Sequence, residues 1–213
     1  MKLDFAPSRD CGLCPRLAGF RNQNRSAYPD FFNAPVPAFG PLDARLLIVG
    51  LAPGLKGANQ TGRPFTGDFA GDLLYATLGK YGFATGQYDQ RPDDGLTLMD
   101  CRVTNGVRCV PPQNKPVGAE INACRPFLEQ EIAAMSKLEI IVALGGISHG
   151  TVLGALGQRK AAWKFAHAAL HKLPDAPLLV DSYHCSRYNT NTGRLTEDMF
   201  HDVFRAVRAT LDG

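Results

Sequence analysis

The chain has 213 residues, of which 45% are hydrophobic, and 23 lysines and arginines against 20 aspartates and glutamates give a net charge of +3. These values are typical of one globular domain and exclude a disordered, coiled-coil or collagen-like chain. No segment reaches the roughly 18 apolar residues of a membrane helix, and the first ten residues resemble no signal or transit peptide. We therefore expect a monomeric cytoplasmic protein that starts near Met1 and does not associate with membranes.

Residues 1–44 are rich in proline and predict an irregular N-terminal extension, with Cys11 and Cys14 in a C-x2-C at its head. Cys109 and Cys124 form a second pair, separated by fourteen residues. Without a secretory signal, such thiols favour metal ligation over disulfides. Four thiolates could hold Zn²⁺ or a 4Fe-4S cluster, and the spacing alone does not separate these two. Unrelated buried thiols are the remaining alternative.

Short apolar runs that predict strands alternate along the chain with periodic segments that predict helices. We expect strands at 45–50, 96–105, 139–144 and 177–183, and helices at 68–81, at 116–137, from about 148, and after Thr196 as N-cap. This alternation is typical of a parallel sheet covered by helices on both faces. The prediction is therefore a single α/β domain over residues 1–213. It has a central parallel four-stranded sheet flanked by helices, plus the N-terminal cysteine-containing extension.

Ligand sites of parallel sheets lie at the carboxyl ends of the strands, so the segments that follow the strands are the most informative. Residues 50–68 contain five glycines but neither the phosphate-loop nor the dinucleotide-binding pattern. They also carry Asn59, Phe65 and Asp68, and Asp68 is equally well placed to cap the helix that follows. His184 directly follows the last strand, where an imidazole can donate to an oxygen that gains charge. We expect these groups to converge at one edge of the sheet.

These residues carry a resemblance. GLAPG, N-x-T-G-R-P-F-T-G-D, T-N ahead of C-x14-C, H-x-S and N-T-G-R-L-T resemble the motifs of the uracil-DNA glycosylase superfamily. The similarity is closest to its iron-sulfur branch, family 5 (type b), and runs from Cys11 to the C-terminal helix. It implies an enzyme that flips uracil, and often other deaminated bases such as hypoxanthine and xanthine, out of DNA. Hydrolysis of the N-glycosidic bond then leaves an abasic site. The resemblance also implies a 4Fe-4S cluster on Cys11, Cys14, Cys109 and Cys124, with zinc as the alternative.

The resemblance further implies roles for single residues. His184 is expected to stabilise the departing base, Phe65 to stack on it and Asn105 to bind its edge. Leu51 and Ala52 stand where the superfamily usually has a polar residue that handles water, and there we expect only their backbone N–H groups to act as donors. Water activation therefore falls to Asp68, which can accept a proton, or to a water held by Asn59.

Family members usually have proline after the histidine, where this chain has Cys185, so the loop loses a fixed φ angle. We expect this loop to fill the gap left by the flipped base and to contact DNA through Ser186, Arg187, Tyr188, Asn189 and Arg194. Five stretches without acidic residues hold 15 of the 23 basic residues, which predicts a positive face. The alternative functions are a non-catalytic, metal-containing nucleic-acid-binding module and an iron-sulfur electron carrier.

Overall fold

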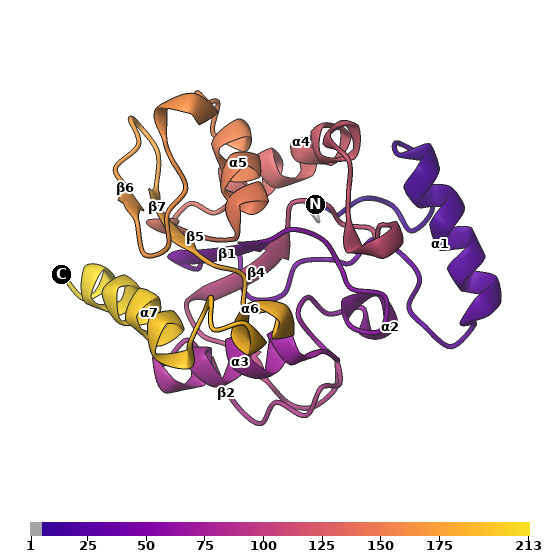
Figure 1. Ribbon diagram of the computed structural model, residues 1–213, viewed down its shortest axis with the longest axis horizontal. Coiled ribbons are helices and arrows are strands. Elements are labelled where there is room, and N and C mark those ends of the chain that lie inside the picture. Colours follow the sequence, from indigo (N-terminus) through magenta and orange to yellow (C-terminus); the bar gives the residue numbers. More distant parts are fainter. Residues whose placement is uncertain (1–5) are drawn as a thin grey trace.

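Five strands form the central sheet, in the order β4-β1-β5-β7-β6. The computed structural model describes residues 6–213, and Figure 1 shows the sheet between two layers of helices. Four strands run parallel, and β6 pairs antiparallel with β7 at one edge. Their bounds are β1 Leu46–Gly50, β4 Cys101–Asn105, β5 Ile140–Leu144, β6 Leu170–His171 and β7 Leu178–Ser182. The predicted α/β architecture is confirmed, with five strands instead of four.

Helices cover both faces of the sheet because the strands are apolar on both sides. Ile48 and Val142 pack with α3 and α7, whereas Val49 and Ile141 pack with α4 and α5. Figure 1 shows these two helical layers, below and above the sheet. The helices are α3 Phe69–Lys80, α4 Gly118–Ala134, α5 Gly146–Ala155 and α7 Glu197–Leu211.

Two predicted helix starts are confirmed by their caps. The Asp68 side chain accepts a hydrogen bond from the Gly71 N–H at the start of α3, and Thr196 accepts one from Met199 at the start of α7. Each cap satisfies a backbone donor that the first helical turn leaves free. The helix after β5 begins at Gly146, two residues earlier than expected.

The predicted strand 96–105 is in fact two strands with different partners. Asp100 has a φ of +51°, which interrupts the extended backbone, and its carboxylate accepts from Arg45. Before this break, β3 Thr97–Leu98 pairs antiparallel with β2 Ala84–Thr85 in a separate small sheet. After it, β4 joins the central sheet beside β1.

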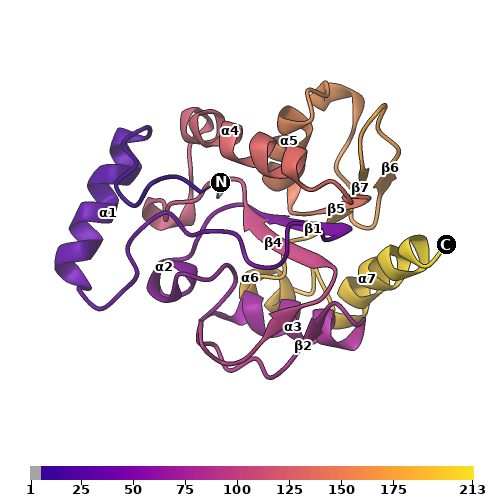
Figure 2. The ribbon, with the colours of Figure 1, turned by 180° about the vertical axis from the view of Figure 1, so that it is seen from behind.

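The N-terminal extension is not irregular throughout, because α1 runs over Pro15–Ala27 and begins after Cys14. Its buried residues are Leu17, Arg21 and Asn24, so polar side chains occupy the helix face that faces the protein. This face shows no apolar periodicity, which is why the sequence pattern does not reveal the helix. Figure 2 shows α1 standing to one side of the sheet, beyond β4. The remaining short helices are α2 Ala58–Thr61, η1 Pro112–Asn114, η2 Lys160–Ala162 and α6 Arg187–Asn191.

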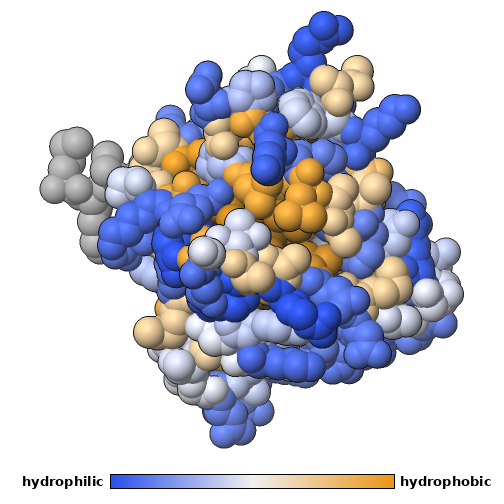
Figure 3. All heavy atoms as spheres, turned by 90° about the vertical axis from the view of Figure 1, so that its left-hand side faces the viewer, coloured by the Kyte–Doolittle hydropathy of each residue, from blue (hydrophilic) through white to orange (hydrophobic). Residues whose placement is uncertain are grey.

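Apolar side chains reach the surface on the side where β6, β7 and the end of α7 lie, and polar residues surround them (Figure 3). Leu170 of β6 is 51% exposed. Within residues 6–213, no helix combines the length and the apolar character that a bilayer crossing requires.

Candidate active site

The carboxyl end of β1 brings Phe65 and Asn105 together around Gly50. Gly50 pairs in register with Asn105 at the end of β4. A Cβ atom added to Gly50 would overlap the Asn105 Oδ1 atom and would lie 2.5 Å from Cζ of Phe65. Only glycine allows an aromatic ring and a carboxamide to approach this strand end so closely. The two residues that the sequence suggested for base binding therefore lie against the same backbone position.

Phe65 has a left-handed backbone, with a φ of +52°, and several neighbours hold it there. The Tyr88 hydroxyl donates to the Phe65 carbonyl at 3.1 Å and accepts from the Gly67 N–H at 3.4 Å. The Tyr75 hydroxyl donates to the Pro64 carbonyl at 2.5 Å. A non-glycine residue with positive φ costs free energy and persists only where its surroundings impose it. The Phe65 ring is therefore held in place before any ligand binds.

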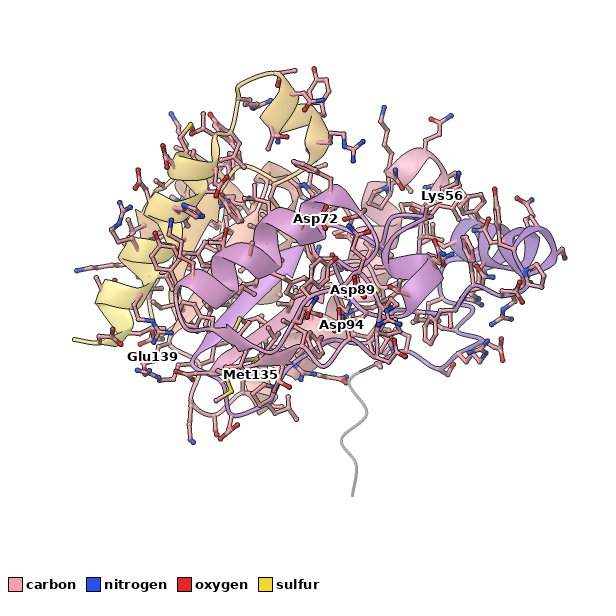
Figure 4. The ribbon with its side chains drawn as sticks, turned by 90° about the horizontal axis from the view of Figure 1, so that it is seen from below. Lys56, Asp72, Asp89, Asp94, Met135 and Glu139 are labelled. Carbon is pink, nitrogen blue, oxygen red and sulfur yellow. The ribbon has the colours of Figure 1, made fainter. Side chains whose placement is uncertain are left out.

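Arg63 and Asp94 stabilise the loop that contains Phe65. Their side chains form a buried two-point ion pair at 2.8 and 2.7 Å. The rings of Phe39, Tyr75 and Tyr88 surround the guanidinium at 5.1 to 5.7 Å. Arg63 holds the pKa of Asp94 well below its usual range. In Figure 4, Asp94 lies close to Asp89 beside α3, and its carboxylate accepts from the Asp89 and Leu96 N–H groups, which orders the loop that carries Tyr88.

His184 faces this arrangement from the end of β7. Its ring stacks on the Phe65 ring at 5.9 Å with 28° between the planes, and its Cβ lies beside Gly145 after β5. Burial lowers the pKa of His184 to about 4. The imidazole is therefore neutral at physiological pH and can donate one N–H without carrying a charge. The expectation that the strand-end groups converge is met for Phe65, Asn105 and His184.

Asp68 caps α3 and lies against the glycine-rich loop at the same time. One of its carboxylate oxygens accepts from the Gly71 N–H, and the other lies so near Gly57 that a Cβ there would come within 2.5 Å. Burial raises the pKa of Asp68 above its usual value, although two backbone N–H groups partly oppose this shift. A carboxylate with a raised pKa is a stronger base than an exposed one.

Asn59 has a clear structural contact. Its buried amide Nδ2 donates to Asn33 Oδ1 at 2.9 Å, and the backbone N–H of Asn33 donates to the Asn59 carbonyl. These contacts tie the N-terminal segment to the glycine-rich loop. The water-holding role expected of Asn59 would use its Oδ1 atom or its second N–H, because Asn33 engages only one of the two amide hydrogens.

In the loop after His184, some side chains are held by contacts within the protein and others are exposed to solvent. The Asn189 Nδ2 atom donates to the His184 carbonyl at 2.8 Å, and Ser186 caps α6. Arg187 and Arg194 rest on the Phe69 and Tyr183 rings at 5.3 and 4.8 Å. Tyr188 is 74% exposed. Asn189 and Ser186 therefore shape the loop, and Tyr188 is its most prominent free side chain.

Leu51 and Ala52 continue the backbone from β1 towards the cysteine-containing region. The Leu51 carbonyl accepts from the Val107 N–H at 2.9 Å, which extends the pairing beyond the two strands. Ala52 packs against the small core of Leu17, Val107 and Cys124. This segment therefore links the strand-end site to the cysteines.

The four cysteines suggested as ligands line one cavity between α1, the loop after β4, and α4. Apolar side chains and Arg21 complete its wall, the lining residues being Pro7, Cys11, Leu13, Cys14, Leu17, Ala18, Arg21, Val107, Cys109, Ala123, Cys124 and Phe127. Two N–H groups point at sulfur atoms: Arg21 Nη1 at Cys109 and the Arg108 backbone at Cys124, at 3.7 and 3.4 Å. Arg21 Nε is buried and has no hydrogen-bond partner among the described residues. Such donors suit a group that carries negative charge.

The spacing of the sulfur atoms bears on which group would fit. Tetrahedral zinc with Zn–S bonds of about 2.3 Å requires its sulfurs to lie about 3.8 Å apart. Within residues 6–213, no three of these cysteines have sulfur atoms that all lie within 4.8 Å of one another. At least some of these sulfur atoms therefore lie farther apart than a single tetrahedral ion requires. Cys101 and Cys185 lie elsewhere, fully buried in the main core.

The predicted positive face is weaker than the sequence count suggests. Several arginines of the acid-free stretches pair with carboxylates: Arg16, Arg25, Arg45, Arg63, Arg102 and Arg108. Arg108 and Glu131 form a buried pair under β4, at 2.5 Å. An ion pair leaves little net charge for a phosphate, so fewer cations are free than the sequence implies.

Comparison with known proteins agrees with this arrangement. The model of the uracil DNA glycosylase superfamily matches residues 37–208. The chain belongs to this superfamily. It is 43% identical over 203 residues to the type-5 uracil-DNA glycosylase of Thermus thermophilus, covering 93% of this chain and 92% of that protein. It is 42% identical over 208 residues to the type-5 enzyme of Mycobacterium leprae, covering 93% and 90%. The resemblance seen in the motifs is confirmed, including the type-5 branch.

Sequence reasoning missed two residues of this uracil-DNA glycosylase superfamily member. Tyr88 and Asp94 lie in a polar loop with no motif of their own, yet they hold the backbone around Phe65. The one available signal was the pair of adjacent acids at 93 and 94 before Gly95, which is typical of a turn.

Proposed function

We propose that the protein is a monofunctional DNA glycosylase that excises uracil by hydrolysis of the N-glycosidic bond. The observation that carries this proposal is the meeting of Phe65, Asn105 and His184 around the strand end at Gly50. An aromatic plane, a carboxamide and a neutral imidazole are the groups that a pyrimidine extruded from the duplex requires. The type-5 relatives named above add support, because their names state uracil-DNA glycosylase activity.

Each group has a distinct part in this reaction. The flipped base stacks on Phe65, which offsets a few kcal/mol of lost stacking in the duplex. Asn105 offers a donor and an acceptor to the edge of the base. As the glycosidic bond breaks, negative charge develops on the base oxygens, and the His184 N–H stabilises it together with backbone N–H groups near Leu51 and Ala52.

Asp68 is the proposed acceptor of the proton from the attacking water. Burial raises its pKa, which strengthens its ionised form as a base. Asn59 Oδ1 is available to orient the water. Of the two residues, only Asp68 can accept the proton that the water loses.

We further propose that hypoxanthine and xanthine are also substrates. The proposal rests on the apolar side chains of Leu51 and Ala52, which set no polar requirement beside the proposed position of the base. A pocket with few polar contacts discriminates weakly between related bases.

The four cysteines of the cavity are the proposed ligands of a 4Fe-4S cluster. The spread of the sulfur atoms, the N–H groups directed at Cys109 and Cys124, and the buried Arg21 guanidinium favour it over zinc. When bound, such a cluster would cross-link α1, the loop after β4 and α4 through four Fe–S bonds. A brown purified protein with absorption near about 400 nm is expected, whereas a colourless protein would contradict a cluster.

Deaminated DNA is the proposed partner, contacted through the loop after His184, with Tyr188 entering the gap left by the base. The test is an abasic-site assay on duplexes that contain uracil, hypoxanthine or xanthine. We expect abasic sites with uracil, and none when His184→Ala replaces the wild type although DNA binding persists. The absence of product from every lesion, with cluster-loaded protein, would refute the glycosylase proposal. Cleavage of uracil alone would refute only the broad specificity.

A further inference from the structure

Two histidines and an aspartate outside the strand-end site come together from three different elements. His149 lies in the first turn of α5, His171 in the edge strand β6, and Asp181 in β7. His149 Nδ1 lies 2.7 Å from one carboxylate oxygen of Asp181, and His171 Nε2 lies 2.8 Å from the other. All three offer ligand atoms within 4.8 Å of one another. No step of the proposed base excision uses them.

The cluster is nearly closed to solvent. The Asp181 side chain is fully buried and His149 almost so, while 11% of the His171 side chain remains exposed. The rings of Phe165 and Trp163 form the wall, at 5.7 Å from His149 and 5.9 Å from His171. A buried carboxylate is stable only with hydrogen-bond donors or a positive partner, and His171 is the member of the cluster that keeps some exposure to solvent.

Two polar contacts hold the His149 ring beside the carboxylate. Its Nδ1 faces the Asp181 carboxylate, and its Nε2 faces the Trp163 carbonyl at 3.0 Å. Each ring nitrogen therefore faces an oxygen atom, and the two contacts fix the orientation of the imidazole. A metal ion between His149 and Asp181 would replace the contact between Nδ1 and the carboxylate.

Nε2 of His149 has the contact that a metal-bound histidine needs. Histidine ligands almost always donate their second N–H to a carbonyl or carboxylate, which fixes the ring and strengthens the ligand. The Trp163 carbonyl fills this role. Two imidazoles and a carboxylate form a donor set that suits zinc and related divalent ions, with one coordination position left for water.

We propose that His149, His171 and Asp181 form a binding site for a divalent transition metal, with Zn²⁺ as the ion to test. The site is separate from the cysteine cavity and does not depend on the proposed glycosylase activity. A metal there would bridge α5 to the β6–β7 edge and fix residues 163–171 on the sheet. This segment carries His167. Its Nδ1 atom accepts from the Tyr183 N–H, and its ring stacks on the Tyr183 ring at 5.0 Å. Tyr183 directly precedes His184 in the sequence.

The test compares zinc binding by the wild-type protein and by His171→Ala, both carrying whatever group the cysteines hold. Equilibrium dialysis against zinc should show an additional ion in the wild type that His171→Ala lacks. The zinc affinity of His171→Ala should fall by more than about 100-fold. Loss of a residue that only hydrogen-bonds to a metal ligand costs at most about that much. Since any zinc at the cysteines is common to both proteins, the difference reports this site alone. Zinc should also raise the melting temperature of the wild type more than that of the variant.

Two controls make the outcome decisive. His201→Ala removes another buried histidine, which contacts Lys80, and should leave zinc binding unchanged. His149→Gln provides a second change within the site if His171→Ala fails to fold, and it should also lose the ion. Equal zinc binding by the wild type and by folded site variants would overturn the proposal and leave the cluster as a hydrogen-bond network.

Discussion

The Asn189 side chain donates from Nδ2 to the backbone carbonyl of His184 across 2.8 Å, so the loop expected to meet DNA also holds the histidine at the strand end. Asn189→Asp would replace this donor with an acceptor and turn attraction into repulsion. We expect single-turnover uracil excision to fall by about 100-fold, because displacement of a catalytic group by about 1 Å has that effect. Asn191→Asp, which adds the same charge to an exposed position of the same loop, should cost far less. Equal losses of activity in the two variants would show that the added negative charge, and not the lost hydrogen bond to His184, causes the effect.

Gly50→Ala should abolish uracil excision with little loss of fold. Its methyl group would overlap Asn105 Oδ1 and the Phe65 ring. Both side chains would then have to leave the positions in which we propose that they contact the base. Single-turnover kinetics and circular dichroism would test this expectation. Gly79→Ala is the control, because a Cβ at this position in α3 meets nothing within 4 Å. It should keep activity and stabilise the protein by about 0.5–1 kcal/mol. An active Gly50→Ala enzyme would exclude the proposed place of the base.

Tyr88→Phe would remove one hydroxyl that bonds both the Phe65 carbonyl and the Gly67 N–H. We expect a loss of about 1 kcal/mol in the free energy of unfolding, measured in urea, as for one hydrogen bond. We also expect slower excision than this loss of stability explains, because the left-handed Phe65 backbone would be less firmly held. Tyr28→Phe, whose ring stacks on Phe31 at the N-terminal segment, is the matched change and should leave the rate unaltered. A Tyr88→Phe variant with unchanged rate would show that the loop needs no such support.

The pH dependence of excision follows from two shifted groups. Burial lowers the pKa of His184 to about 4, so its neutral form persists as the pH falls through the usual histidine range. Asp68 must be ionised to act as a base, and its pKa is raised, so activity should be lost only on the acid side as the pH approaches that pKa. Single-turnover rates between about pH 5 and pH 8 should therefore show no decline that depends on His184 near the ordinary histidine value of about 6.5. A decline there that His184→Gln removes would contradict the neutral imidazole.

The sequence was most informative where a residue follows an apolar run. Gly50, Asn105 and His184 could be placed at one sheet edge because the ends of parallel strands coincide. Asp68 could be recognised as a cap from the periodic residues after it. The two-residue strand β6 could not be predicted, because so short a segment shows no alternation of apolar and polar residues.

Contacts between distant segments explain the other features that the sequence did not predict. Arg63 counted as a free cation in the sequence, yet its partner Asp94 lies 31 positions further on, in a loop whose conformation no local pattern reveals. Likewise, His149, His171 and Asp181 share no spacing that suggests a cluster. Only the packing of α5 against the edge of the sheet brings them together.

The left-handed backbone of Phe65 also bears on how a damaged base is chosen. Such a conformation costs about 1–3 kcal/mol, which the ion pair of Arg63 and the hydroxyl groups of Tyr75 and Tyr88 offset while the protein folds. The aromatic plane is then already rigid when DNA arrives, and no segment has to close over the base to create it. During recognition the base would therefore stack on a surface that is already formed, without a conformational change of the loop that carries Phe65.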